Sequence, residues 1–180
     1  MRVFAQSVTV EAIGNSLKIR APGFNFLKGD PLVRLKDGRL VRVELAALVL
    51  PGPGKPPAAT ARGIFALSYD LWEERFAVTA VGARSQSVSH LMQAAAEAWC
   101  LEQLSIPLGA LGALGRDAPF WIRLEYRMLD SDGTADPDDS GYTLQALIDL
   151  LSRRRKTVAS SPPIEAGPFT LPVRVPSSSR

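Results

Sequence analysis

The segment from Arg62 to Val81 constrains the fold most, because two runs of alternating apolar and polar residues flank a polar turn. Successive side chains of a β-strand point to opposite faces, so this spacing predicts a long two-stranded ribbon with one apolar face. We expect the turn at Trp72 to Arg75. The ribbon contains no nucleophile beside a base and no phosphate-binding loop, so it indicates a fold class and no activity. The residues expected on its apolar face are Phe65, Leu67, Tyr69, Leu71, Phe76, Val78 and Ala80.

Shorter patterns predict the elements that precede this ribbon. Asp30 is expected to cap a short helix and Gly38 to end it, with Leu32 and Leu35 facing inward. Proline cannot donate to a strand ladder, so a run of prolines predicts an exposed loop. The predicted elements are a hairpin over 8–10 and 17–19, a helix over 31–37, a strand over 39–50 and a loop over 51–57.

A longer helix is expected to cover the sheet, from Ser87 to Leu104. Its apolar residues recur at helical spacing and predict one buried stripe. Phe120 to Leu129 returns to strict alternation and predicts a strand with one buried and one exposed face. A last helix is predicted from Tyr142 to Arg155, with an apolar side of Leu144, Leu147, Ile148 and Leu151. The stripe of the covering helix is Val88, Leu91, Met92, Ala95 and Trp99.

These patterns together predict an α+β fold. We expect a curved antiparallel sheet of about six strands in meander order, with one main covering helix and short flanking helices. Residues 7–156 are expected to form a single domain. Residues 157–180 are rich in proline and serine and are expected to be disordered or loosely docked.

Composition excludes several classes of function. The chain has 180 residues, of which 46% are hydrophobic and 22% charged, as in one soluble globular domain. Its formal net charge of +3 does not argue for a nucleic-acid partner. Cys100 is the single cysteine, which excludes an intramolecular disulfide framework and a cysteine-ligated zinc site. No apolar run reaches the roughly 18 residues of a membrane span.

The first residues allow two interpretations. Val3 and Ala5 are small or aliphatic at the two positions that signal peptidase inspects, and polar Gln6 follows. In the first interpretation residues 1–6 are the remnant of a signal peptide, the true start lies upstream, and the protein is in the cell envelope or periplasm. In the second, Val3 and Phe4 begin the first strand and the protein is cytoplasmic. An in-frame hydrophobic leader upstream of Met1 in the genomic DNA would decide between them.

The core from about Gly29 to Asp130 resembles an uncharacterised family of exported bacterial envelope proteins, a domain of unknown function. The resemblance is carried by three runs: LVRVEL after DGR at 37–45, LSYDLWEERFAVT at 67–79, and the strand at 120–126. It implies an exported β-rich domain with one covering helix between strands. It implies no activity, because none is established for the family.

Candidate catalytic and metal-binding groups give weak signals. The aspartates between Asp130 and Asp139 resemble a calcium loop, but Thr134 and Ala135 stand where an EF-hand requires Asp or Asn and then glycine. A solvated acidic turn explains them better. His90 and Cys100 could form a nucleophile pair only through tertiary folding, and a surface histidine near the helix start with a half-buried structural cysteine is favoured. The carboxylates Asp70, Glu73 and Glu74 are expected at a solvated hairpin tip. No metal, cofactor or catalytic residue is therefore predicted.

Two surfaces remain as candidates for binding. Arg153, Arg154, Arg155 and Lys156 close the last predicted helix and could contact anionic lipid head groups, giving a peripheral membrane contact. The alternative is that they complement the dipole of a helix docked on the sheet. Between the sheet and the covering helix, four side chains are expected either to line a cavity or to form plain core: Phe65, Leu67, Tyr69 and Trp99.

The sequence thus favours a non-enzymatic exported envelope module that binds a partner protein or an apolar ligand. For a partner protein, Tyr69 and the Trp72 turn are the first places to mutate. The alternative is a cytoplasmic enzyme or regulatory subunit whose site is assembled from distant residues. The oligomeric state is not predicted.

Overall fold

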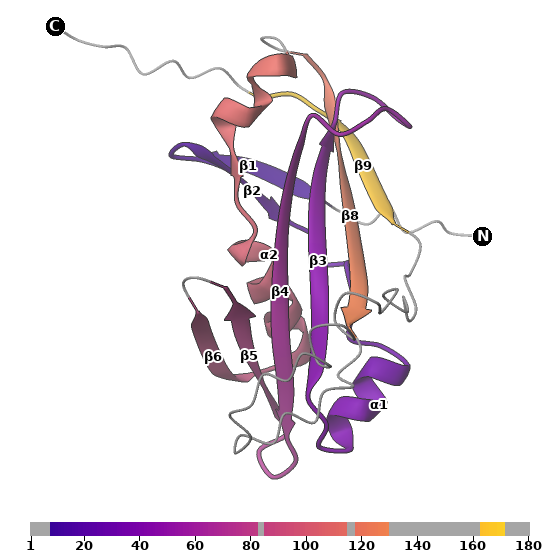
Figure 1. Ribbon diagram of the computed structural model, residues 1–180, viewed down its shortest axis with the longest axis vertical. Coiled ribbons are helices and arrows are strands. Elements are labelled where there is room, and N and C mark those ends of the chain that lie inside the picture. The colour runs from indigo at the N-terminus through magenta and orange to yellow at the C-terminus, as the bar shows by residue number, and fades with distance from the viewer. Residues whose placement is uncertain (1–7, 83–84, 115–117, 130–162, 172–180) are drawn as a thin grey trace, which may run out of the picture.

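The computed structural model describes residues 8–82, 85–114, 118–129 and 163–171, which form an α+β fold with two antiparallel sheets (Figure 1). The larger sheet has six strands in the order β6-β5-β4-β3-β8-β9, and the smaller has the order β1-β2-β7. The strands are β1 Thr9–Ile13, β2 Ser16–Arg20, β3 Val41–Leu50, β4 Ala59–Asp70, β5 Arg75–Val81, β6 Gln86–Leu91, β7 Ile106–Pro107, β8 Phe120–Leu129 and β9 Ile164–Phe169. The helices are α1 Asp30–Lys36, α2 Gln93–Gln103 and a 3-10 helix over Leu108–Leu114.

The predicted ribbon is the β4–β5 hairpin. Its register pairs Phe65 with Ala80, Leu67 with Val78 and Tyr69 with Phe76, so one face collects the apolar side chains. Phe65 and Leu67 are fully buried, whereas Ser68, the next residue along β4 after Leu67, points to the other face of the strand and is exposed. Alternation within the strands therefore predicted the buried face correctly.

Meander order holds only for β3 to β6. The chain then leaves the sheet through α2 and β7, and β8 returns to pair with the free side of β3, from Arg42 opposite Leu129 to Leu50 opposite Trp121. As a result β3 is central and carries hydrogen bonds on both sides. Nearly all of its side chains are buried.

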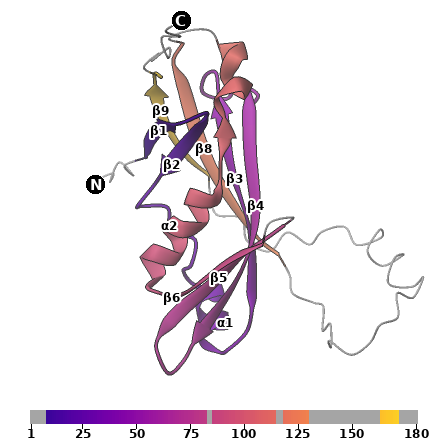
Figure 2. The same cartoon turned by 90° about the vertical axis from the view of Figure 1, so that its left-hand side faces the viewer.

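One face of the six-stranded sheet is covered by α2 and the β1–β2 hairpin, which lie on the same side of β3 and β4 (Figure 2). The main core lies between these layers. Burial of this apolar surface is the main force that holds the layers together. Its fully buried side chains include Leu17, Ile19, Phe26, Leu27, Leu45, Phe65, Leu67, Ile106, Phe120 and Ile122.

The helix predicted from Ser87 to Leu104 is wrong in its first part, because β6 occupies Gln86–Leu91 and α2 begins at Gln93. Val88 pairs with Val78 and Leu91 pairs with Phe76. A step of three residues along β6 therefore lies opposite a step of two residues along β5. A β-bulge of this kind turns the strand spacing of two into a spacing of three. The spacing that indicated a helical turn is therefore produced by a bulge.

The buried side of α2 also differs from the predicted stripe. The helix turns Ala96, Glu97, Cys100 and Leu101 into the protein. Met92 precedes the helix and is 60% exposed, Ala95 is exposed, and Trp99 is half-buried. Because the true helix starts at Gln93, the stripe combined residues from two different elements.

Two other expectations are corrected. The N-cap of α1 is Gly29, at a φ of 63°, and no side chain caps the helix, so Asp30 is its first residue rather than its cap. Leu35 is buried as expected, and Leu32 is half-buried. The tail was expected to be disordered or loosely docked, which is wrong for Ile164–Phe169, because these residues form β9 and pair with β8. The expected acidic turn at 130–139, last helix at 142–155 and basic cluster at 153–156 lie outside the described residues.

Candidate binding site at the β4–β5 hairpin tip

The turn between β4 and β5 is built by the carboxylate of Asp70. Its Oδ1 accepts hydrogen bonds from the backbone N–H groups of Trp72, at 2.8 Å, and Glu73, at 3.0 Å. These bonds, first the one from Glu73, lower the pKa of Asp70, because they stabilise its charged form. The strand ends at Asp70 for this reason, and Leu71, which was expected on the apolar face, lies in the turn and is 57% exposed.

The other side of the turn is held by Arg75. Its Nη1 donates to the backbone carbonyl oxygens of Glu73, at 3.4 Å, and Glu74, at 3.1 Å. Glu74 has a φ of 52°, in the left-handed region that a non-glycine residue adopts only when its surroundings hold it there. Below the turn the rings of Tyr69 and Phe76 contact each other in a tilted arrangement, with centroids 4.8 Å apart. We call residues 70–75 the hairpin tip.

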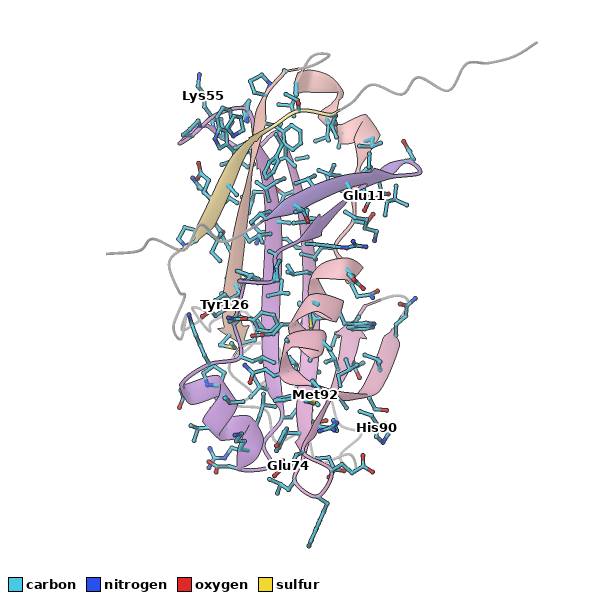
Figure 3. All side chains as sticks on the ribbon, turned by 180° about the vertical axis from the view of Figure 1, so that it is seen from behind. Glu11, Lys55, Glu74, His90, Met92 and Tyr126 are labelled. Carbon is cyan, nitrogen blue, oxygen red and sulfur yellow. The ribbon has the colours of Figure 1, made fainter. Side chains whose placement is uncertain are left out.

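The hairpin tip presents Trp72 to solvent. Trp72 is 96% exposed, although tryptophan is a large residue that is highly buried on average. Leu71 beside it and Met92 at the end of β6 are also exposed. Met92, Glu74 and His90 lie at the same end of the molecule (Figure 3). The tip therefore combines a fixed backbone with an apolar end.

The bulge in β6 ties this strand to the hairpin tip. His90 sits in it with a φ of 61°, and its Nε2 lies 2.9 Å from Oε2 of Glu73. Its Nδ1 lies 2.9 Å from the hydroxyl oxygen of Ser89. Bulges re-aim side chains, and here the bulge directs His90 toward the turn. A shallow pocket of about 240 Å³ lies alongside, lined by Ser68, Tyr69, Asp70, Glu73, Arg75, Phe76, Ala77, Ser89 and His90.

Ser89, His90 and Glu73 form a serine–histidine–carboxylate chain, which the sequence did not reveal because Glu73 comes from the turn between β4 and β5. In serine hydrolases such a chain activates the serine under two conditions. A carboxylate shielded from solvent orients the histidine, and hydrogen-bond donors are positioned to stabilise the oxyanion that forms on the substrate. Here the side chains of His90 and Glu73 are 69% and 53% exposed. The contacts of His90 with Ser89 and Glu73 hold β6 against the tip, and these exposed side chains lack the shielding that catalysis requires.

A nucleophile pair of His90 and Cys100, which was the less favoured alternative from the sequence, is also disfavoured by position. Cys100 is fully buried on α2, rather than half-buried as expected. Burial raises the pKa of its thiol to about 12, with a further contribution from the charge of Glu97. A thiol with this pKa is not a nucleophile near neutral pH. His90 is exposed on β6.

Four side chains, Phe65, Leu67, Tyr69 and Trp99, are expected from the sequence either to line a cavity or to form plain core. Phe65 packs edge-on against Trp99, with ring centroids 6.3 Å apart, and Leu67 is completely buried. Tyr69 is half-buried and borders the pocket at the hairpin tip. These contacts are those of a packed core, and an apolar ligand at this place stays a prediction.

Sequence reasoning missed one buried carboxylate. Glu97 on α2 is 4% exposed, and its Oε1 accepts a 2.7 Å hydrogen bond from the backbone N–H of Leu27. Gln93, one helical turn earlier, donates to the carbonyl oxygen of Leu27 at 2.7 Å. Burial raises the pKa of Glu97, and hydrogen bonds from Leu27 and Phe26 offset this only in part. The spacing of Gln93 and Glu97 at i and i+4 was the only signal for this pair.

Another polar pocket, of about 310 Å³, lies on the face of the six-stranded sheet opposite the one that α2 covers. Glu44 sits in it between two arginines, with Arg62 at 3.4 Å and an ion pair to Arg127. Glu125 lies in the same pocket. The charges are balanced, so this pocket offers a charged ligand no net attraction.

No protein-family model matches the chain, and the searches of the curated proteins and of the solved structures found no match. Within residues 8–82, 85–114, 118–129 and 163–171, no cluster of three or more histidine, cysteine, aspartate or glutamate side chains could hold a metal ion. In the same ranges no helix has the length and apolar character needed to cross a membrane. The resemblance to exported envelope proteins therefore remains an interpretation of the residue pattern.

Proposed function

We propose that this protein is a non-enzymatic binding module that engages a partner protein through the hairpin tip. The observation that carries the proposal is the exposure of Trp72 on a turn fixed from both sides by Asp70 and Arg75. Tryptophan is enriched among the residues that dominate binding energy at interfaces. A turn that is already ordered loses little conformational entropy when it binds.

Of the two expected ligand classes, the packing favours a partner protein over an apolar ligand. The space between sheet and helix is occupied by the contacts of Phe65, Leu67 and Trp99 with the core. We further infer that the sheet curves around α2, which the contacts of α2 with β2, β4 and β5 support. Location in the cell envelope is part of the proposal and rests on the residue pattern alone.

The test compares three forms of the full chain, each tagged and expressed in its source cells: wild type, Trp72→Ala and Ile13→Ala. Ile13 is a matched control, since it is a 51% exposed apolar residue at another hairpin. We expect at least one protein to co-purify with the wild type and the control, and to fall about tenfold or more with Trp72→Ala, as for an interface residue worth over about 1.4 kcal/mol. Identical sets of co-purifying proteins for all three forms would refute the proposal.

A further inference from the structure

We propose that the hairpin tip docks into an apolar pocket on the partner protein whose rim carries lysine or arginine side chains. This inference rests on the proposed function and adds the chemistry of the partner. The apolar end of the tip is Leu71 and Trp72, and the pocket that receives them must be apolar for the contact to be favourable. The charges around Trp72 decide what surrounds that pocket.

The hairpin tip is acidic on a basic protein. Between Asp70 and Arg75 there are three carboxylates and one guanidinium, a formal net charge of −2, whereas the whole chain carries +3. The guanidinium of Arg75 is engaged with backbone carbonyl oxygens of the turn. A partner that approaches the tip therefore meets mainly negative charge.

Glu74 is the carboxylate best placed to meet a partner. Asp70 is occupied by the backbone of the turn, and Glu73 is paired with His90. In the part of the chain that the structure describes, the carboxylate of Glu74 has no hydrogen-bond or ion-pair partner. It is exposed and follows Trp72 by two residues. Complementary charges at an interface rim steer association and set its salt dependence.

The same charges disfavour a membrane. An exposed tryptophan and leucine at a loop end also suit the interface of a lipid bilayer. Anionic lipids, however, attract basic segments and repel carboxylates. A tip with three carboxylates around its apolar end fits a protein with a cationic rim better than a lipid surface.

The test uses the full chain with a photoreactive residue in place of Leu71, cross-linked in its source cells and analysed by mass spectrometry. The same probe is combined with Trp72→Ala, Glu74→Lys or Glu11→Lys. Glu11 is an exposed glutamate on β1 and serves as the matched charge control. The cross-linked protein is then purified, and its Kd for each form is measured at about 50 and 300 mM salt, a range over which screening of exposed charges changes strongly.

We expect one partner protein whose cross-link is lost with Trp72→Ala. Its Kd should rise about fivefold or more with Glu74→Lys, since an exposed pair is worth up to about 1 kcal/mol and the lysine adds repulsion. Glu11→Lys should change the Kd less than twofold, and salt should weaken the wild type more than Glu74→Lys.

Three results would overturn the inference. A cross-linked protein that requires Trp72 but is indifferent to salt and to Glu74→Lys would refute the cationic rim and leave the proposed function intact. Cross-links to lipid, with Trp72-dependent binding to phosphatidylcholine–phosphatidylglycerol vesicles, would show that the tip binds a membrane. The absence of any Trp72-dependent cross-link would refute the proposed function and the inference together.

Discussion

The stability of the Glu97→Gln variant relative to the wild type should increase as the pH rises. Burial raises the pKa of this carboxyl above its usual value of 4.5, so the folded chain holds a proton that the unfolded chain has released. The contribution of Glu97 to stability is therefore fully present below about pH 4.5 and is lost as the pH rises through the folded pKa. Glu97→Gln carries no such proton and lacks this dependence.

The hydrogen bond to Leu27 sets the magnitude for the alanine variant. Glu97→Ala removes the acceptor of a buried backbone N–H, and an unsatisfied buried donor costs about 1 to 3 kcal/mol. Glutamine keeps a side-chain oxygen at the same place and avoids most of this loss. Any cost of burying the amide NH₂ group is the same at every pH, so it does not affect the pH dependence.

Urea denaturation followed by tryptophan fluorescence at several values between pH 4.5 and 8.5 provides the assay. The free energy of unfolding of Glu97→Gln minus that of the wild type should increase with pH and then level off. Using this difference cancels the titration of Asp70 and other groups that both forms share. A difference that is constant with pH, or that decreases, would refute the claim that burial of the charge dominates.

Three further predictions concern stability and reactivity. Trp99→Ala should lower the free energy of unfolding by about 2 to 3 kcal/mol. This loss is smaller than that expected for replacing a fully buried tryptophan, because Trp99 packs on Phe65 but is half-buried. A negligible loss, together with a lipid in organic extracts of the native protein, would favour a ligand cavity. A stop codon after Lys156 removes β9 and should lower Tm by about 5 to 10 °C, because the protein loses a packed aromatic residue and a strand pairing. A stop codon after Leu171 keeps β9 and should leave Tm unchanged within about 2 °C. Equal Tm values for the two truncated forms would show that β9 is dispensable. Cys100 should resist a thiol reagent at pH 8 in the native protein and react at once in urea, and rapid native labelling would contradict its burial.

The sequence correctly predicted the elements whose hydrophobic spacing fits only one type of secondary structure. Strict alternation in β4, β5 and β8 gave both the strands and their buried faces. At β6 the same reasoning failed, because the bulge at His90 produced the spacing of a helical turn between Val88 and Leu91. A single sequence holds no local mark that distinguishes the two cases.

Features that depend on distant pairing could not be predicted. The return of β8 to β3 and the addition of β9 to the edge join segments far apart in the chain. The same holds for the tie between Glu73 and His90, which requires knowing that β5 and β6 are neighbours. The position of Trp72 in a polar turn was predictable, whereas its nearly complete exposure depends on the hydrogen bonds of Asp70.

The central position of β3 has a consequence for how the protein is made. During synthesis β3 can pair with β4 as soon as both emerge, but its other edge must wait for β8, whose residues lie roughly 80 positions later. Until then β3, most of whose side chains are buried in the finished fold, presents unpaired backbone groups, and exposed strand edges of this kind pair with other chains. We therefore expect yield in cells to depend on translation speed and chaperone supply between residues 50 and 129, and variants that slow the arrival of β8 should aggregate even when the finished fold is unaffected.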